Sequence, residues 1–96
     1  MGLRGIELDP RQFALISKAL ADPKRYRILQ KIAASSEAPT CSCVCEWLGI
    51  APATVSHHLK ELENAGLVSL KRNGKFAHIS LRRDVLKAYV RQLSAL

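Results

Sequence analysis

The chain has 96 residues, the size of one small domain, and a chain this short buries a modest core that oligomerisation often completes. Its 15 Lys and Arg against 8 Asp and Glu give a formal net charge of +7, which favours a polyanionic partner, nucleic acid first. No apolar run approaches the ~18 residues that span a bilayer, and the first ten residues lack the apolar core of a signal peptide. We therefore expect one domain over residues 1–96, dimeric, cytoplasmic and without a membrane partner.

Two aspartates, each directly before a proline, mark the starts of the first two helices. Asp9-Pro10 and Asp22-Pro23 each join a capping side chain to a residue whose fixed φ suits the first helical position. Apolar residues then recur at helical spacing, and a polar stretch over residues 35–39 ends the second helix.

The middle of the chain predicts a helix-turn-helix motif. A short third helix is expected between Thr40, its cap, and Gly49, its stop. Pro52 opens a longer helix over about residues 52–65, and Gly66 ends it. Two helices joined by so short a turn have the geometry that places the second helix in a DNA groove.

A β-hairpin is expected after these helices. Residues 67–72 and 76–81 predict two strands around Asn73 and Gly74, a strong hairpin signal because both residue types tolerate positive φ. This hairpin would be a wing over about residues 67–81.

Asp84 is predicted to cap a last helix with a wide apolar band, formed by Val85, Leu86, Tyr89, Val90, Leu93 and Leu96. We expect this band to pair with the first helix across a two-fold axis. The fold class is therefore mainly α with a β-hairpin, a winged helix-turn-helix in the order α-α-α-α-β-β-α that dimerises through its first and last helices.

Several local segments also carry a resemblance; they span residues 19–23, 25–29, 43–46, 54–60, 66–68 and 74–75. Together they resemble the ArsR/SmtB family of bacterial metalloregulatory repressors, of the arsenic-responsive type, over nearly the whole chain. The resemblance implies a cytoplasmic homodimer that binds double-stranded operator DNA when apo and leaves it on binding its inducer. An enzyme is not expected, because no base is placed against a nucleophile beside a substrate pocket.

The predicted DNA contacts lie on the second helix of the motif, which is the recognition helix, and on the wing. Polar residues expected to reach base edges and phosphates in the major groove are Thr54, Ser56, His57 and Lys60. The spacing of Val55, Leu59 and Leu62 assigns them to the buried face. In the wing, long cations able to reach phosphate or the minor groove are Lys71, Arg72 and Lys75.

Two further features bear on DNA binding. Lys24 and Arg25 are either phosphate contacts or part of a solvated face. Relatives often begin the recognition helix with a polar cap and a Gln, whereas this chain has Ala51, Pro52 and Ala53. One capping hydrogen bond, worth ~1 kcal/mol, and one base contact are therefore missing.

Three cysteines, Cys41, Cys43 and Cys45, are the candidate metal ligands. An odd number of cysteines within five positions is a poor disulfide framework but suits a thiolate cluster in a reducing compartment. Cys43-Val44-Cys45 coincides with the family motif for inducers bound on the third helix, and Cys41 extends it. Three thiolates suit arsenic(III) or antimony(III), which prefer a pyramid of three sulfur atoms, whereas cadmium, lead or zinc usually takes a fourth ligand.

Helix geometry opposes a preformed three-sulfur site. Residues at i and i+2 point about 200° apart at ~100° per residue, so Cys43 is expected to face away from Cys41 and Cys45. Closing the site would distort the first turn of the helix that supports the recognition helix, which is our hypothesis for derepression. The positive end of this helix is expected to favour the thiolate form of the cysteines.

Three alternatives stay open from the residues alone. A repressor of the same fold could respond to thiol oxidation, or to cadmium, lead or zinc. A winged helix without an effector would bind nucleic acid but ignore thiol reagents. A zinc or nickel site on the terminal helices is not expected, because no His follows Asp84. His57 and His58 are not a ligand pair, because adjacent helical residues diverge, and His78 is expected to be a surface or strand-face residue.

Overall fold

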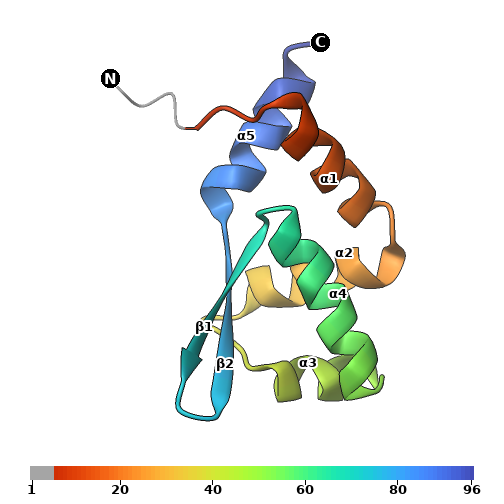
Figure 1. Cartoon of the computed structure of the whole chain (residues 1–96), viewed down its shortest axis with the longest axis vertical. Helices are drawn as coiled ribbons and strands as arrows, with labels where there is room; N and C mark the ends of the chain where they lie inside the picture. The colour runs from red at the N-terminus through yellow and green to blue at the C-terminus, as the bar shows by residue number, and fades with distance from the viewer. Residues whose placement is uncertain (1–5) are drawn as a thin grey trace.

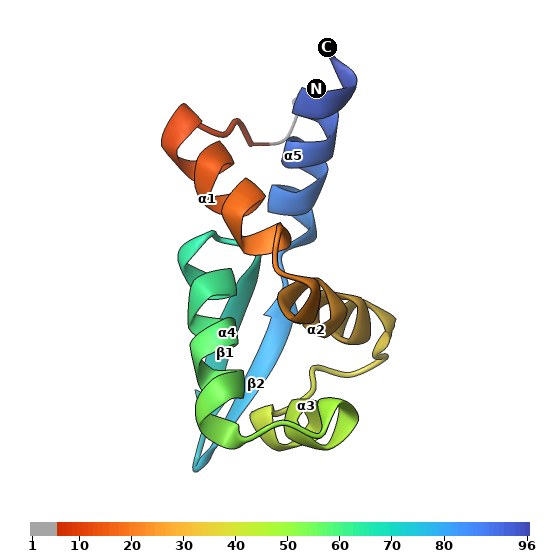
Figure 2. The same ribbon diagram turned by 90° about the vertical axis from the view of Figure 1, so that its right-hand side faces the viewer.

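The computed structural model describes residues 6–96 and arranges them as five helices and a two-stranded sheet. The elements are α1 (Pro10–Leu20), α2 (Pro23–Ala34), α3 (Cys41–Leu48), α4 (Pro52–Asn64), β1 (Val68–Asn73), β2 (Phe76–Leu81) and α5 (Arg83–Ser94). Their order, α-α-α-α-β-β-α, confirms the predicted fold class. Helices α1 and α5 lie together at one end of the molecule, while α3, the start of α4 and the hairpin turn lie at the other (Figures 1 and 2).

Local capping chemistry begins and ends the helices largely as predicted. The side chains of Asp9, Asp22 and Thr40 accept hydrogen bonds from the first free backbone N–H groups of α1, α2 and α3. Helix α3 stops at Gly49, where a φ of 64° takes the chain into the left-handed region. Ala51 precedes α4 and makes no side-chain capping bond, as expected from its methyl group.

The hairpin turn lies one residue later than predicted. Strand β1 occupies Val68–Asn73 rather than residues 67–72, and Asn73 pairs with Phe76 across the antiparallel ladder. The two-residue turn therefore starts at Gly74, with φ 67°, and within residues 6–96 no non-glycine residue has positive φ. A turn with one positive-φ position is less costly here than the predicted one, which would also place Asn73 at positive φ.

The predicted cap of the last helix was wrong. Helix α5 begins at Arg83, preceded by Arg82, and no side chain caps it. Asp84 lies inside the first turn, where its carboxylate forms an ion pair with Arg82 at 3.0 Å and accepts a hydrogen bond from the Val85 N–H at 2.9 Å. A carboxylate in the first turn still interacts favourably with the positive end of the helix.

The core lies where α2, α3, α4 and the sheet meet. Its fully buried members include Ile28, Val44, Val55, Leu59, Leu62, Leu67 and Ile79. Burying each such side chain contributes about 1.5–3 kcal/mol, so these contacts hold α4 firmly against α2 and α3. Within residues 6–96, no helix is long and apolar enough to cross a membrane.

The segment before α3 is attached to the sheet. Thr40 forms an isolated antiparallel bridge with His78 of β2, and the Ile79 N–H donates to the Pro39 carbonyl at 2.8 Å. The His78 Nδ1 also lies 3.3 Å from the Ala38 carbonyl oxygen. The bridge covers one edge of β2, and the start of α3 is thereby held against the hairpin.

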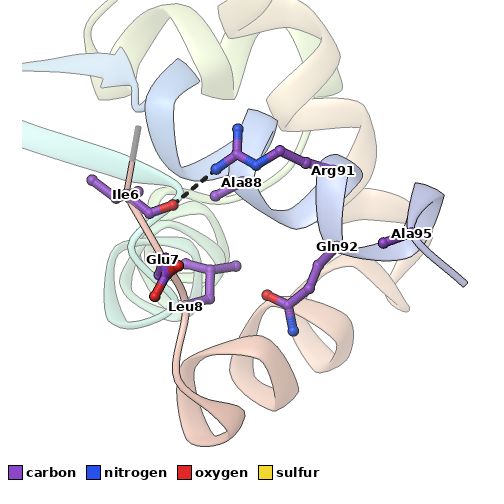
Figure 3. A pocket seen from close by; sticks show the side chains of 7 residues that line it. All are labelled: Ile6, Glu7, Leu8, Ala88, Arg91, Gln92 and Ala95. Carbon is purple, nitrogen blue, oxygen red and sulfur yellow. Dashed lines mark hydrogen bonds between the residues drawn. The ribbon is translucent and has the colours of Figure 1, made fainter. Parts of the chain in front are cut away.

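Helix α5 packs on α1 and on the segment that precedes α1. The rings of Phe13 and Tyr89 lie 4.7 Å apart, and the Tyr89 hydroxyl is hydrogen-bonded to Ser17 at 2.8 Å. On another side of α5, Arg91 donates to the Ile6 carbonyl at 2.9 Å across a hollow of about 330 Å³ (Figure 3). Side chains of the N-terminal segment and of α5 line this hollow, so α5 is only partly covered within one chain.

A single polar side chain, His58 of α4, is buried among residues 6–96. It is 7% exposed, and its Nδ1 has no hydrogen-bond partner. Burial lowers the pKa of His58 below its ordinary value, and the nearby Asp22 carboxylate opposes this shift only in part. The folded chain therefore binds a proton on His58 less readily than the unfolded chain does.

We expect acid to destabilise the fold through His58. The unfolded chain binds a proton on this histidine near pH 6.5, whereas the folded chain binds it only at lower pH, so stability falls as the pH drops through and below about 6.5. In urea unfolding at about pH 7.5 and about pH 5.5, a His58→Leu variant should lose part of this pH dependence. The exposed His57→Leu control should keep it, and an unchanged pH dependence in His58→Leu would contradict the assignment.

Candidate nucleic-acid interface and thiol cluster

Helix α4 has one buried and one exposed face, as the spacing predicts. Val55, Leu59 and Leu62 are buried in the core. The exposed side chains include all four predicted contacts, Thr54, Ser56, His57 and Lys60. Because its other face is fixed in the core, α4 presents these polar groups to solvent on a rigid support.

The first turn of α4 is open at its end. Ala51 offers no side chain to the N–H groups of this turn, and Pro52 removes one of them. Residues 51–54 are all exposed, so the remaining N–H groups face a surface rather than a packed neighbour. Amide groups and the positive helix end suit a phosphate oxygen at this position.

The wing, formed by β1, β2 and their turn, carries a basic surface. Lys71 and Arg72 lie near the end of β1, and Lys75 lies in the turn; all three are exposed. The turn lies at the same end of the molecule as α3 and the start of α4 (Figures 1 and 2). A duplex that contacts the start of α4 is therefore within reach of the wing cations.

Lys24 and Arg25, the two basic residues at the start of α2, have different surroundings. Arg25 donates from Nε to the Ala19 carbonyl at 2.9 Å and pairs with Asp22 at 3.8 Å. These bonds give Arg25 a structural role in the connection between α1 and α2. Lys24 is exposed.

The three cysteines lie on two sides of α3. Cys41 and Cys45 are partly buried against the core, as expected for residues one helical turn apart. Cys43 is partly exposed beside Trp47 and His78, where it lines a hollow of about 460 Å³. Within residues 6–96, no group of three or more His, Cys, Asp or Glu side chains is arranged to hold a metal ion. The regular helix thus separates the sulfur atoms, as its geometry predicts.

The two cysteines of the first turn have opposite pKa shifts. Hydrogen bonds from the Thr40 hydroxyl, 3.4 Å from the sulfur, and from the backbone lower the pKa of the Cys43 thiol. Burial raises the pKa of the Cys41 thiol, and the nearby Cys45 adds to this effect more than Arg72 reduces it. The pKa of Cys43 thus shifts in the direction expected at the helix start, although hydrogen bonds with Thr40 are its main cause, whereas desolvation shifts the pKa of Cys41 in the opposite direction.

The position of Cys41 close to the wing was not predicted from the sequence. Cys41 shares a hollow of about 230 Å³ with Arg72, Lys75 and Phe76. The bridge between Thr40 and His78 creates this arrangement, and it joins residues 38 positions apart. Periodicity identifies His78 only as a strand residue and gives no signal for such a long-range pair.

Several known proteins are similar to this chain in sequence. A family model described as a helix-turn-helix domain matches residues 20–70. The uncharacterized helix-turn-helix transcriptional regulator YceK of Bacillus subtilis is 34% identical and covers 85% of this chain and 82% of its own. A homolog of the cadmium resistance regulatory protein CadC from Staphylococcus aureus is 33% identical, over 85% of this chain and 67% of its own. The arsenical resistance operon repressor of Staphylococcus xylosus is 30% identical, over 85% and 76%.

Solved structures share the fold. The ArsR family transcriptional regulator RHA00566 superposes with a TM-score of 0.81 at 22% identity, over 94% of this chain and 91% of that one. A homodimeric winged helix-turn-helix DNA-binding domain from Mycobacterium bovis has a TM-score of 0.74 at 28% identity, over 88% and 79%. With its fold, its exposed recognition helix and these relatives, the chain belongs to the ArsR/SmtB family of DNA-binding transcriptional repressors.

Proposed function

We propose that this repressor leaves its operator when arsenic(III) or antimony(III) binds the thiolates of Cys41, Cys43 and Cys45. One observation carries the proposal: the three cysteines begin α3, the helix that packs on α4 and is bridged to the wing through Thr40 and His78. A change at the start of α3 therefore acts on both DNA-binding elements at once.

The donor set fits a soft metalloid by its chemistry. Three thiolates match the three bonds that trivalent arsenic or antimony forms, and they need no further ligand from the chain. The names of the relatives include arsenical and cadmium resistance regulators, which supports a thiophilic inducer. Cadmium, lead or zinc would call for a fourth ligand, which the cysteines do not supply.

The geometry of α3 suggests how binding is coupled to release. Cys43 is separated from Cys41 and Cys45 by the helix itself, so one atom can bond to all three sulfur atoms only if the first turn unwinds. Unwinding breaks the capping hydrogen bond from the Cys43 N–H to the Thr40 hydroxyl. It also strains the bridge between Thr40 and His78 of β2. The DNA-competent arrangement and the three-sulfur site then exclude each other, which is the differential binding that allostery requires.

A homodimer would complete the repressor. Apolar side chains at the α1 and α5 end stay exposed in one chain, among them Leu15, Val90 at 51% and Leu93 at 43%. The Mycobacterium bovis neighbour of the same fold is described as homodimeric. Pairing this end across a two-fold axis would bury these groups and present two copies of α4 to half-sites about one DNA turn, ~34 Å, apart.

The wing cations are expected to bind phosphate rather than to read sequence. Replacing Lys71, Arg72 and Lys75 by Ala should weaken binding to all DNA sequences and lower the slope of log Kd against log salt by about one for each phosphate that is no longer bound. Fluorescence anisotropy with selected and random duplexes at several salt concentrations measures both effects. The exposed Lys18, Lys31 and Lys87 provide a control with the same charge change. Weaker binding confined to the selected operator would show that the wing reads bases.

Operator release should depend on all three thiols. With an operator selected from a random DNA pool, arsenite should release the reduced wild-type protein at about one equivalent per chain, as three free thiols disappear, because each arsenic bonds three sulfur atoms. A variant with Ser at positions 41, 43 and 45 should bind the operator like wild type and stay bound.

Titration with arsenite, antimonite, cadmium and zinc, and separately with an oxidant, ranks the inducers on the same DNA. Release by an oxidant or cadmium, without release by arsenite, would contradict the metalloid proposal and favour the alternatives of thiol oxidation or a divalent metal. Unchanged release of the triple Ser variant would remove the cysteines from the mechanism altogether.

A further inference from the structure

The C-terminal end of α4 lies toward the end of the molecule formed by α1 and α5 (Figures 1 and 2). After Ala65, the C-cap residue of α4, Gly66 takes a φ of 83° and turns the chain toward β1. The Arg82 N–H, directly before α5, donates to the Leu67 carbonyl at 2.7 Å. The turn that ends α4 is therefore attached to the start of α5.

Gln12 of α1 reaches the same turn from the other side. Its Nε2 donates to the Ala65 carbonyl at 3.4 Å, and among residues 6–96 no other side-chain hydrogen bond joins α1 or α5 to the end of α4. A Cβ at position 66 would lie 2.6 Å from this Nε2 and 3.9 Å from Val85 Cγ1 of α5. Side chains of α1 and α5 thus both close on a glycine, which permits this close approach.

The support of Gln12 is itself rigid. Its backbone N–H donates to the Asp9 carboxylate at 2.8 Å, which is the cap of α1. The neighbouring Phe13 contacts Tyr89 of α5, with 4.7 Å between the ring centres. The first turn of α1 is thus held by its cap and by α5, so the Gln12 amide extends from a fixed base.

The position of this contact gives it leverage over the DNA-binding end of α4. The helix has 13 residues, and Thr54, Ser56 and His57 lie near its start, at the end away from Gln12. At 1.5 Å per residue α4 is ~20 Å long, so a tilt of ~5° about its C-terminal end would move its start by ~2 Å. In a dimer joined through α1 and α5, such a tilt changes the distance and angle between the two copies of α4.

We propose that Gln12 is a positioning residue that sets the half-site separation accepted by the dimer. Packing on α2, α3 and β1 holds α4 within the core of one chain. Gln12 ties this unit to α1, and so fixes its orientation relative to the two-fold axis. The inference rests on the homodimer of the proposed function and is independent of the inducer.

The test compares operators that differ only in the separation of their two half-sites. One added base pair moves the second half-site by ~3.4 Å and rotates it by ~36°. Wild type should bind this operator about tenfold more weakly than the selected one, because a dimer of fixed geometry then engages one half-site at a time. Gln12→Met, which keeps the side-chain length and loses the N–H donor, should reduce the difference to about threefold or less. Fluorescence anisotropy measures each Kd.

A duplex with a single half-site separates positioning from folding. Gln12→Met should bind it within about twofold of wild type, because the DNA-facing side chains of α4 are distant from the change. Gln12→Glu places an acceptor against the Ala65 carbonyl and should behave like Gln12→Met. The control Gln30→Met makes the same substitution at an exposed position of α2 and should keep the tenfold difference.

Two outcomes would overturn the positioning role. One is a tenfold difference that persists in both Gln12 variants. The other is a loss of affinity that is equal for the single half-site and for both spacings, which would mean that Gln12 only stabilises the fold.

The inducer and the positioning role fail separately. Arsenite that does not release the operator would overturn the proposed inducer and leave the spacing measurements unaffected. A wild-type chain that sediments as a monomer and shows no preference for spacing would overturn the homodimer and this inference together. A sedimenting dimer with unchanged spacing preference in both Gln12 variants would overturn the positioning role alone.

Discussion

The short pairing between the segment before α3 and the edge of β2 fixes how the helix-turn-helix sits against the wing. Thr40 takes part in it twice, as the bridge partner of His78 and as the cap of α3. One residue thus sets both the start of the helix and its distance from the sheet. Since α4 follows α3 after the turn at Gly49 and packs into the same core, this pairing joins the two DNA-binding elements in addition to the direct packing of α4 on β1.

Much of the fold follows from local chemistry that the sequence displays directly. Asp9, Asp22 and Thr40 cap helices because each short acceptor precedes the helix that it serves, and apolar spacing identifies the buried face of α4. Asp84 departs from its predicted role because a carboxylate near a helix start acts equally well from inside the first turn, here with Arg82 as its partner. The turn at Gly74 differs from the prediction by one residue because two hairpin turns compete there.

The site was predictable only in part. The exposed side of α4 and the separation of Cys43 from its two neighbours follow from the helical repeat alone. The position of Cys41 beside Arg72 and Phe76 depends on the pairing of Thr40 with His78. Helical or strand periodicity in the sequence does not predict such a long-range pairing. The raised pKa of the Cys41 thiol has the same origin, because the desolvation that causes it depends on what packs around α3.

If Cys41, Cys43 and Cys45 bind the inducer, their placement at every second position makes the stability of α3 part of the response. If the inducer must unwind the first turn of α3 to reach its third sulfur, the cost of unwinding is subtracted from the energy of the As–S bonds. Every 1.4 kcal/mol of added stability in that turn then raises the inducer concentration needed for half response by about tenfold. Residues that touch neither metalloid nor DNA, such as the capping Thr40, could in this way tune the detection threshold of the repressor.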